Sequence, residues 1–330
     1  TWISNVNYVL SAAETMDGSK EDIAYVLGNA YAIRALSYFN LANWFARPPY
    51  SALQEKYRWN DPGVPIYTEP TYKDFTGKKR ETLSVVFERI NKDIDDAIDM
   101  LEIGKDSPLG GTKSHISLNV ALGIKTRVAM ATGDWDAALR SAERIIESEE
   151  YTIGGESELM GGMNTLSASN VMWGAGIETT EQSGGYAGFF THMDNIDGAY
   201  AQSAPKLINS SLYKHMGAND VRRRWWDPEN EDSPYISNKF RFSNVAAWLG
   251  DYIYMRVEEV YFNAAEAALR LGDEDKAVLY LNAVMQKRDS SYDASNYTIS
   301  YKNNTKVGNA TVIITAKSDS IYSGSVSKKF

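Results

Sequence analysis

The helical architecture is encoded most clearly by residues 117–149, which read SLNVALGIKTRVAMATGDWDAALRSAERIIESE. Ser117 and Asp134 can each cap a helix, because their side-chain oxygens can accept hydrogen bonds from the N–H groups of the first turn. Gly133, between the two helices, is a typical helix stop. Apolar residues of the second helix recur at three- and four-residue spacing. The stretch therefore predicts two helices joined by a tight turn.

Residues 257–288 repeat this pattern. Gly272-Asp273 aligns with Gly133-Asp134, and the apolar positions that follow each pair align as well. Two helical hairpins with matched turns and matched apolar stripes are typical of tetratricopeptide-type repeats. We therefore expect a mainly α fold built from such hairpins and carrying long irregular loops.

Two more helices are predicted before residue 117. Residues 21–45 are apolar on more than one side and end before Pro48-Pro49, whereas residues 82–101 carry a single apolar stripe. Residues 46–80 between them are expected to form a long ordered loop. Much of the remaining surface of the helix predicted at residues 82–101 is acidic. We expect its acidic side chains to form a solvated face: Asp93, Asp95, Asp96 and Asp99.

Residues 151–250 lose this periodicity and are rich in Gly, Asn and Ser. Irregular segments on a regular scaffold are where binding sites are usually built. Residues 297–299 and 310–316 are β-prone and predict a small sheet. We therefore divide the chain into a helical binding domain, residues 1–290, in which 151–250 is the variable region, and a β-rich segment, residues 291–330.

Composition excludes several kinds of function. The chain has 330 residues and a formal net charge of -9, which argues against a nucleic-acid partner. It contains no cysteine, and no run of 18 apolar residues that could span a bilayer. The three histidines, His115, His192 and His215, form no ligand pattern, so we expect neither a metal nor another cofactor.

No catalytic motif is recognisable. Nucleophilic catalysis needs a base beside the nucleophile, and the sequence shows no such pattern. The glycine-rich residues 184–188 lack the preceding strand of a phosphate-binding loop. A pair of carboxylates could hydrolyse a glycoside, and the variable region offers Glu178, Glu181, Asp194 and Asp197, though in no motif. We therefore expect a binding protein without catalysis.

Four blocks in order resemble the SusD/RagB family. They are IRALSYFNL at 33–41, RET at 80–82 with the helix after it, GDW at 133–135 with the helix before it, and RVEEVY at 256–261 leading to Arg288. The element Asp220-Val221-Arg222 precedes the fourth block, as is usual in the family. Their order and spacing cover roughly residues 20–290.

The resemblance implies a nutrient-capture lipoprotein outside the outer membrane that works with a TonB-dependent barrel of the SusC type. Family members present glycans, or peptides in the RagB branch, to that barrel. Because the chain opens on Thr1-Trp2-Ile3, we expect a trimmed start, with the lipid anchor upstream of residue 1. After Arg288 the family's further helices are absent; residues 297–330 resemble the later half of a bacterial immunoglobulin-like module.

Aromatic side chains are the candidate ligand contacts, because a flat ring can cover the C–H side of a sugar ring. Core packing is the alternative role for each of them. Trp225 and Trp226 are adjacent, so one is expected to pack inward and the other to face out. The full set of candidates is Trp225, Trp226, Trp173, Tyr186, Phe189, Tyr235, Trp59 and Tyr72.

Three functions follow from the sequence, in descending order. The first is a cell-surface glycan-binding protein that delivers oligosaccharide to a TonB-dependent transporter. The second is a peptide-binding protein of the RagB kind. The third is a tetratricopeptide-type scaffold that docks proteins through its helical groove.

Overall fold

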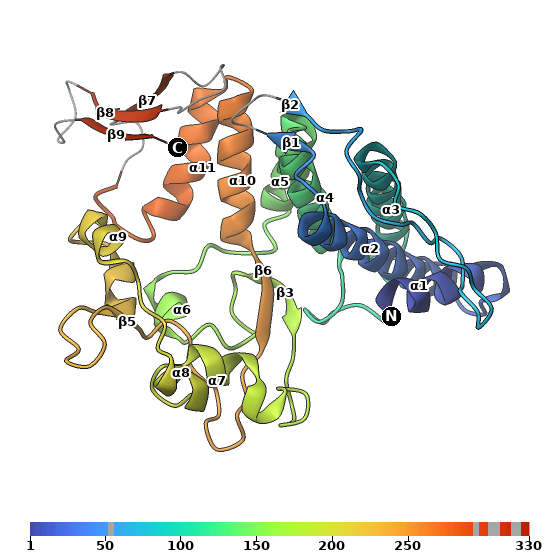
Figure 1. The fold of residues 1–330 in the computed structure, drawn as a ribbon, viewed down its shortest axis with the longest axis horizontal. Coiled ribbons are helices and arrows are strands. Elements are labelled where there is room, and N and C mark those ends of the chain that lie inside the picture. Colours follow the sequence, from blue (N-terminus) through green and yellow to red (C-terminus); the bar gives the residue numbers. More distant parts are fainter. Residues whose placement is uncertain (52–55, 293–296, 303–310, 318–324, 330) are drawn as a thin grey trace.

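The structure is a computed structural model that describes residues 1–51, 56–292, 297–302, 311–317 and 325–329. Long helices form one part of the molecule, and an irregular lobe lies below them in Figure 1. The long helices are α1 (Trp2–Ser11), α2 (Lys20–Phe45), α3 (Leu83–Ile103), α4 (Leu118–Thr132), α5 (Trp135–Glu147), α10 (Val257–Arg270) and α11 (Glu274–Met285). No described helix is long and apolar enough to cross a membrane.

Both predicted hairpins are present, as α4–α5 and α10–α11, and α10 packs against α5. Ser117 accepts a hydrogen bond from the Val120 N–H at 3.3 Å, and Asp134 accepts one from the Ala137 N–H at 3.1 Å. Gly133 adopts φ 71°, a left-handed conformation that glycine reaches at little cost. The mainly α, tetratricopeptide-like prediction is confirmed.

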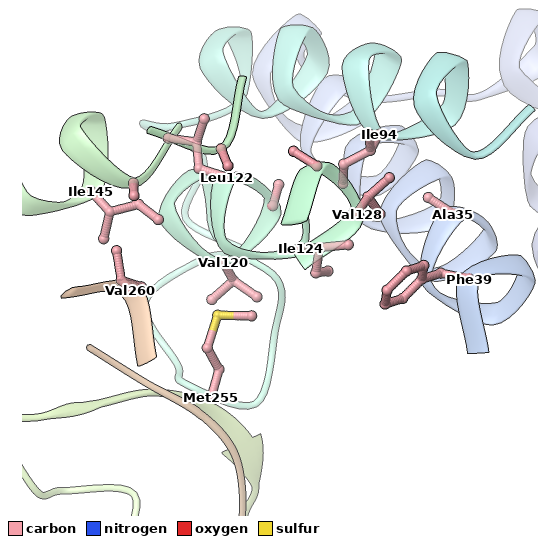
Figure 2. Packing of buried hydrophobic residues seen from close by; sticks show 14 of the residues in the cluster. Ala35, Phe39, Ile94, Val120, Leu122, Ile124, Val128, Ile145, Met255 and Val260 are labelled. Atoms are coloured by element: carbon pink, nitrogen blue, oxygen red, sulfur yellow. The ribbon is translucent and has the colours of Figure 1, made fainter. Parts of the chain in front are cut away.

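One continuous core joins α2, α3, α4, α5 and α10 (Figure 2). Met255, from the strand that precedes α10, also reaches into this core and lies against Gly123 of α4. A Cβ atom at position 123 would lie 2.4 Å from the Met255 sulfur. The irregular lobe is therefore anchored to the scaffold where a helical glycine leaves room for a large side chain.

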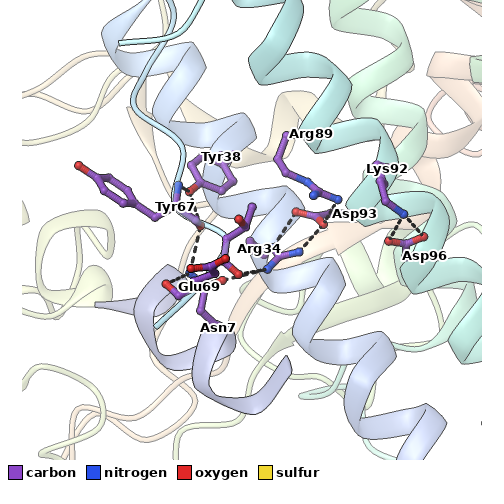
Figure 3. Close-up of polar contacts among 10 residues, drawn as sticks. Asn7, Arg34, Tyr38, Tyr67, Glu69, Arg89, Lys92, Asp93 and Asp96 are labelled. Atoms are coloured by element: carbon purple, nitrogen blue, oxygen red, sulfur yellow. Dashed lines mark hydrogen bonds and ion pairs between the residues drawn. The ribbon is translucent and has the colours of Figure 1, made fainter. Parts of the chain in front are cut away.

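The N-terminal helix α1 was not predicted from the sequence, and it packs on α2. The buried Asn7 donates to the carbonyls of Tyr67 and Glu69, each at 3.0 Å. The Tyr38 hydroxyl also bonds to the backbone of Tyr67 (Figure 3). These contacts hold the loop after α2 in place, and the paired strands β1 (Tyr50–Ser51) and β2 (Lys56–Tyr57) lie within it.

The prediction that the acidic side chains of α3 form a solvated face is wrong for Asp93, which is fully buried. Its carboxylate accepts two hydrogen bonds from Arg34 of α2, at 2.7 and 2.8 Å, and pairs with Arg89 at 2.7 Å (Figure 3). Arg34 also donates to Asn7 at 2.9 Å. The carboxylate thus joins two helices that the sequence pattern could not pair, and Arg34 extends the network to α1.

The irregular lobe contains only short elements. Its helices are α6 (Glu156–Met160), α7 (Phe189–Met193), α8 (Ala199–Ser203) and α9 (Ser210–His215), and its strands are β3 (Val171–Ala175), β4 (Trp226–Asp227), β5 (Ile236–Ser237) and β6 (Tyr252–Arg256). Strand β3 pairs with β6, and β4 with β5, both antiparallel. The predicted loss of helical periodicity in this region is confirmed.

The predicted C-terminal sheet is also present. Strand β8 (Thr311–Ala316) pairs antiparallel with β7 (Tyr297–Lys302) on one side and with β9 (Ser325–Lys329) on the other. The predicted β-prone runs fall on β7 and β8, except for Ala310, which lies outside the described residues. In Figure 1 the sheet lies at one end of the α10–α11 hairpin.

Replacing Asp93 by asparagine is expected to lower the free energy of unfolding by about 3–5 kcal/mol, because Arg34 would be left buried without its carboxylate. Asp96→Asn is the matched control: it lies one turn away on the same helix and pairs with the exposed Lys92, so about 1 kcal/mol or less is expected. Urea unfolding followed by circular dichroism measures both. Equal losses for the two variants would contradict the assignment.

Candidate functional site

Strands β3 and β6 lie side by side in the irregular lobe, and β6 continues directly into α10 (Figure 1). The two strands approach so closely at Gly174 that a Cβ atom there would lie 2.3 Å from the Tyr252 carbonyl oxygen. Since Met255 is held in the core, the side chains of β6 on either side of it have fixed positions relative to the scaffold.

Glu258, in the first turn of α10, connects the lobe to the helices. Its buried Oε1 accepts hydrogen bonds from the Gly154 N–H, the Asn170 amide and Arg288, at 3.1, 2.8 and 2.9 Å. Arg288 also donates to the Gly154 carbonyl. Burial lowers the pKa of Arg288 below its usual value, and the neighbouring carboxylate of Glu258 opposes that shift. The two buried charges are thus paired across three segments distant in sequence.

A cleft of about 330 Å³ opens beside β6, and we call it the aromatic cleft. Its walls are four aromatic rings, two aliphatic side chains, two cations and one carboxylate. They belong to Met163, Phe189, Lys239, Phe240, Asp251, Tyr252, Ile253, Tyr254 and Arg256.

The rings of the aromatic cleft support one another edge to face. The Phe189 ring centroid lies 5.3 Å from that of Phe240 and 5.8 Å from that of Tyr252. The Tyr252 hydroxyl bonds to the carbonyl of Ser183 and accepts the Phe189 N–H at 3.3 Å, which fixes the start of α7. The Tyr254 ring lies 5.0 Å from Trp173 and is 45% exposed, so part of it is open to a ligand.

The three charged groups of the cleft have different kinds of contact partners. Asp251 accepts the Leu166 N–H at 2.8 Å on one oxygen and the Ile177 N–H at 3.0 Å on the other. The ammonium of Lys239 lies over the rings of Trp225 and Phe240, at 4.8 and 5.0 Å from their centroids. Burial, and secondarily the positive charge of Arg256, lowers the pKa of Lys239.

Three of the sequence candidates meet at this cleft. Phe189 lines it, Trp173 supports Tyr254, and Trp225 lies under Lys239. Trp225 is buried, as expected for one member of the pair, and its indole N–H donates to the Leu159 carbonyl at 2.8 Å. Trp226, the first residue of β4, is half-buried rather than turned fully outward.

The other candidates lie elsewhere. Tyr186 is exposed and packs on Tyr200 and Trp248, and Tyr235 packs against Tyr213. Trp59 stacks on Tyr57 and packs on Phe87 of the helical core.

Tyr72 is 72% exposed and contacts Tyr8 of α1. A larger cavity of about 550 Å³ lies in this part of the molecule, between α1, α2 and the loop after α2. The charged residue of this cavity, Arg80, already donates hydrogen bonds to the carbonyls of Gly63 and Phe45. The hydroxyl of Tyr38, which also lines the cavity, is bonded to the backbone of Tyr67. We therefore favour the smaller aromatic cleft as the binding site, because its two cations make no hydrogen bond to a backbone carbonyl among the described residues.

Seven residues of the cleft were not predicted from the sequence: Met163, Lys239, Phe240, Asp251, Tyr252, Ile253 and Tyr254. Arg256, the first residue of the RVEEVY block, also lines the cleft. The signal that could have found part of this set is the period-two spacing of Tyr252, Tyr254 and Arg256, which places alternate side chains on one face of a strand.

Of the four acidic residues considered for glycoside hydrolysis, two are engaged in other contacts. Asp194 is fully buried and accepts the N–H groups of Ile196 and Phe242, and both it and Asp197 pair with Arg241. Glu178 and Glu181 are exposed. Within the part of the chain that the structure describes, no group of three or more His, Asp or Glu side chains could hold a metal ion.

Comparison with known proteins supports the family resemblance. A SusD-like family model, described as starch-binding associating with outer membrane, matches residues 1–129. No curated protein matches the chain. A SusD-like carbohydrate binding protein from Bacteroides vulgatus is 25% identical, with a TM-score of 0.72, over 87% of this chain and 60% of that one.

Other solved structures share the fold. A putative sugar binding protein from Bacteroides vulgatus is 24% identical, with a TM-score of 0.74, over 88% of this chain and 64% of that one. Surface glycan-binding protein A from Bacteroides uniformis is 18% identical, with a TM-score of 0.64, over 87% of this chain and 64% of that one. The chain spans 60–64% of the length of these three proteins.

The fold and the cleft together define a tetratricopeptide-like scaffold that carries an irregular lobe with an aromatic cleft. Residues 1–129 are a SusD-like domain, and the chain has the fold of the SusD superfamily.

Replacing Trp225 by alanine is expected to lower the free energy of unfolding by about 3–5 kcal/mol, because it removes a buried ring. Trp44→Ala, at a tryptophan that is 73% exposed on α2, is the control and should change stability by about 0.5 kcal/mol or less. Thermal and urea unfolding measure both. An unchanged stability of the Trp225 variant would show that this ring is not part of the packed lobe.

Proposed function

We propose that the protein binds glycans at the cell surface and delivers oligosaccharide to a TonB-dependent transporter of the outer membrane. The observation that carries the proposal is the aromatic cleft, four rings with polar groups beside them, in the irregular lobe of a SusD-like fold. Solved relatives of this fold bear the names carbohydrate binding protein and surface glycan-binding protein.

Binding would use the two kinds of group that line the aromatic cleft. The exposed part of the Tyr254 ring, with Phe189 and Phe240, can cover the apolar face of a sugar. Lys239 and Arg256 can donate hydrogen bonds to its hydroxyls. The volume is near the lower end of the roughly 300–1,000 Å³ of ligand pockets, so the cleft would take a short piece of a longer chain.

The remaining assignments of the proposal follow the family resemblance. The protein would be lipid-anchored through a segment upstream of residue 1, on the extracellular face of the outer membrane, with a SusC-like barrel as its partner. Residues 1–290 would form the binding domain and residues 291–330 a separate immunoglobulin-like β segment. Binding would need no cofactor, nucleic acid or catalytic step.

Replacing Tyr254 by alanine is expected to weaken glycan binding about 10-fold, because a ring-on-ring contact contributes about 0.5–1.5 kcal/mol beyond its buried area. Tyr57→Ala is the control: its ring is also about half exposed, but it packs on Trp59 at the helical scaffold. Isothermal titration against a panel of oligosaccharides would measure both.

The same titrations separate the alternatives. Binding of peptides but of no glycan would favour the RagB-like function. Equal affinity of the Tyr254 and Tyr57 variants for a bound glycan would move the site away from the aromatic cleft. Release of reducing ends during prolonged incubation would contradict the assignment of a protein without catalysis.

A further inference from the structure

The aromatic cleft carries two positive charges, and of these only Arg256 has a carboxylate within 4.0 Å among the described residues. Among the described residues, no carboxylate lies within 4.0 Å of the Lys239 ammonium, whose contacts are the rings of Trp225 and Phe240. The ion-pair contact of Arg256 is a distant one, 3.8 Å from the Glu258 Oε2. Both cations line the cleft.

The carboxylates near these charges accept hydrogen bonds from other groups, and one of them, Asp251, lines the cleft beside the two cations. Asp251 accepts two backbone N–H groups, one on each oxygen. The Glu258 Oε1 accepts three hydrogen bonds, including one from Arg288, and the Glu258 Oε2 has only the 3.8 Å contact with Arg256. Asp220 holds Arg222 through two close contacts, at 2.6 and 3.0 Å.

Placing two cations side by side is unfavourable unless something negative joins them. Their mutual repulsion contributes to a lowered pKa for Lys239, behind the larger effect of burial. The surrounding chain carries a formal net charge of -9, so the positive charge of the cleft is local and is not part of a general attraction for anions.

We propose that the ligand of the aromatic cleft is an acidic saccharide, whose carboxylate or sulfate group lies between Lys239 and Arg256 while its ring covers the Tyr254 side. Arginine and lysine bind such groups through charge-assisted hydrogen bonds, which are about twice as strong as neutral ones. The apolar rings around Lys239 exclude water and strengthen the attraction. This inference rests on the proposed glycan-binding function and names the ligand class for the same cleft.

The test is isothermal titration of the protein against matched pairs of oligosaccharides. Each pair consists of an acidic sugar and its neutral counterpart: an oligogalacturonide with its methyl ester, a sialylated glycan with its asialo form, and a sulfated disaccharide with its unsulfated form. We expect at least one acidic member to bind roughly 10-fold tighter than its neutral partner. Its affinity should fall as the NaCl concentration is raised. The pair that shows the preference identifies carboxylate or sulfate.

Variants of Lys239 then locate the effect. Lys239→Met keeps the aliphatic stem over the rings and should reduce the affinity for the acidic sugar roughly 10-fold, a larger factor than for its neutral partner, which loses only a hydrogen bond to a hydroxyl. Lys239→Arg keeps the charge and should retain the preference. Lys78→Met is the matched control, because Lys78 also lies over a ring, 5.4 Å from the centroid of Tyr67, away from the cleft.

The outcomes are distinct. Binding of a neutral glycan with no preference for any acidic partner would overturn the inference and leave the proposed function standing. A preference that Lys239→Met does not reduce, or that Lys78→Met reduces equally, would also overturn it. If no glycan of either kind binds, the proposed function itself fails.

Discussion

The arrangement of the molecule depends on the buried carboxylate of Glu258. A charge removed from water is tolerated only when partners surround it, and here they come from the 154 loop, the residue before β3, and Arg288 beyond α11. Satisfying one carboxylate therefore brings three distant segments together at the first turn of α10. Strand β6 ends two residues earlier, so the same contact sets where the aromatic cleft lies relative to the helices.

A second buried carboxylate, Asp93, has the corresponding role at the other end of the scaffold. It holds Arg34 and Arg89, and Arg34 extends the network to Asn7 of α1. Apolar stripes can pack in several alternative registers, whereas a buried ion pair allows only the one that joins its two charges. In this chain such pairs fix long-range positions, and apolar burial supplies most of the driving force.

The long helices provide the structural support, and the irregular lobe carries the candidate ligand-binding groups. In the larger cavity beside α1 and α2, Arg80 is already bonded to the carbonyls of Gly63 and Phe45. The lobe contributes rings and cations that are held from behind: Tyr254 by Trp173, and Lys239 by Trp225. Binding groups are commonly carried on irregular segments that a rigid scaffold positions.

Local patterns in the sequence were sufficient to predict the two hairpins and their caps, the helices α2 and α3, and the small C-terminal sheet. Cap residues, glycine stops and apolar periodicity act within a few residues, so these elements do not depend on distant partners. Blocks such as RVEEVY were sufficient for the resemblance to the SusD/RagB family. The buried state of Asp93, the helix α1 and most of the cleft were not predictable in this way, since each depends on partners far along the chain. Phe189, Lys239 and Tyr254 meet only because β6 is held by Met255 in the core and by Glu258 at the start of α10. The sequence alone determined the kind of scaffold, and the tertiary contacts decided which aromatic and charged side chains share a site.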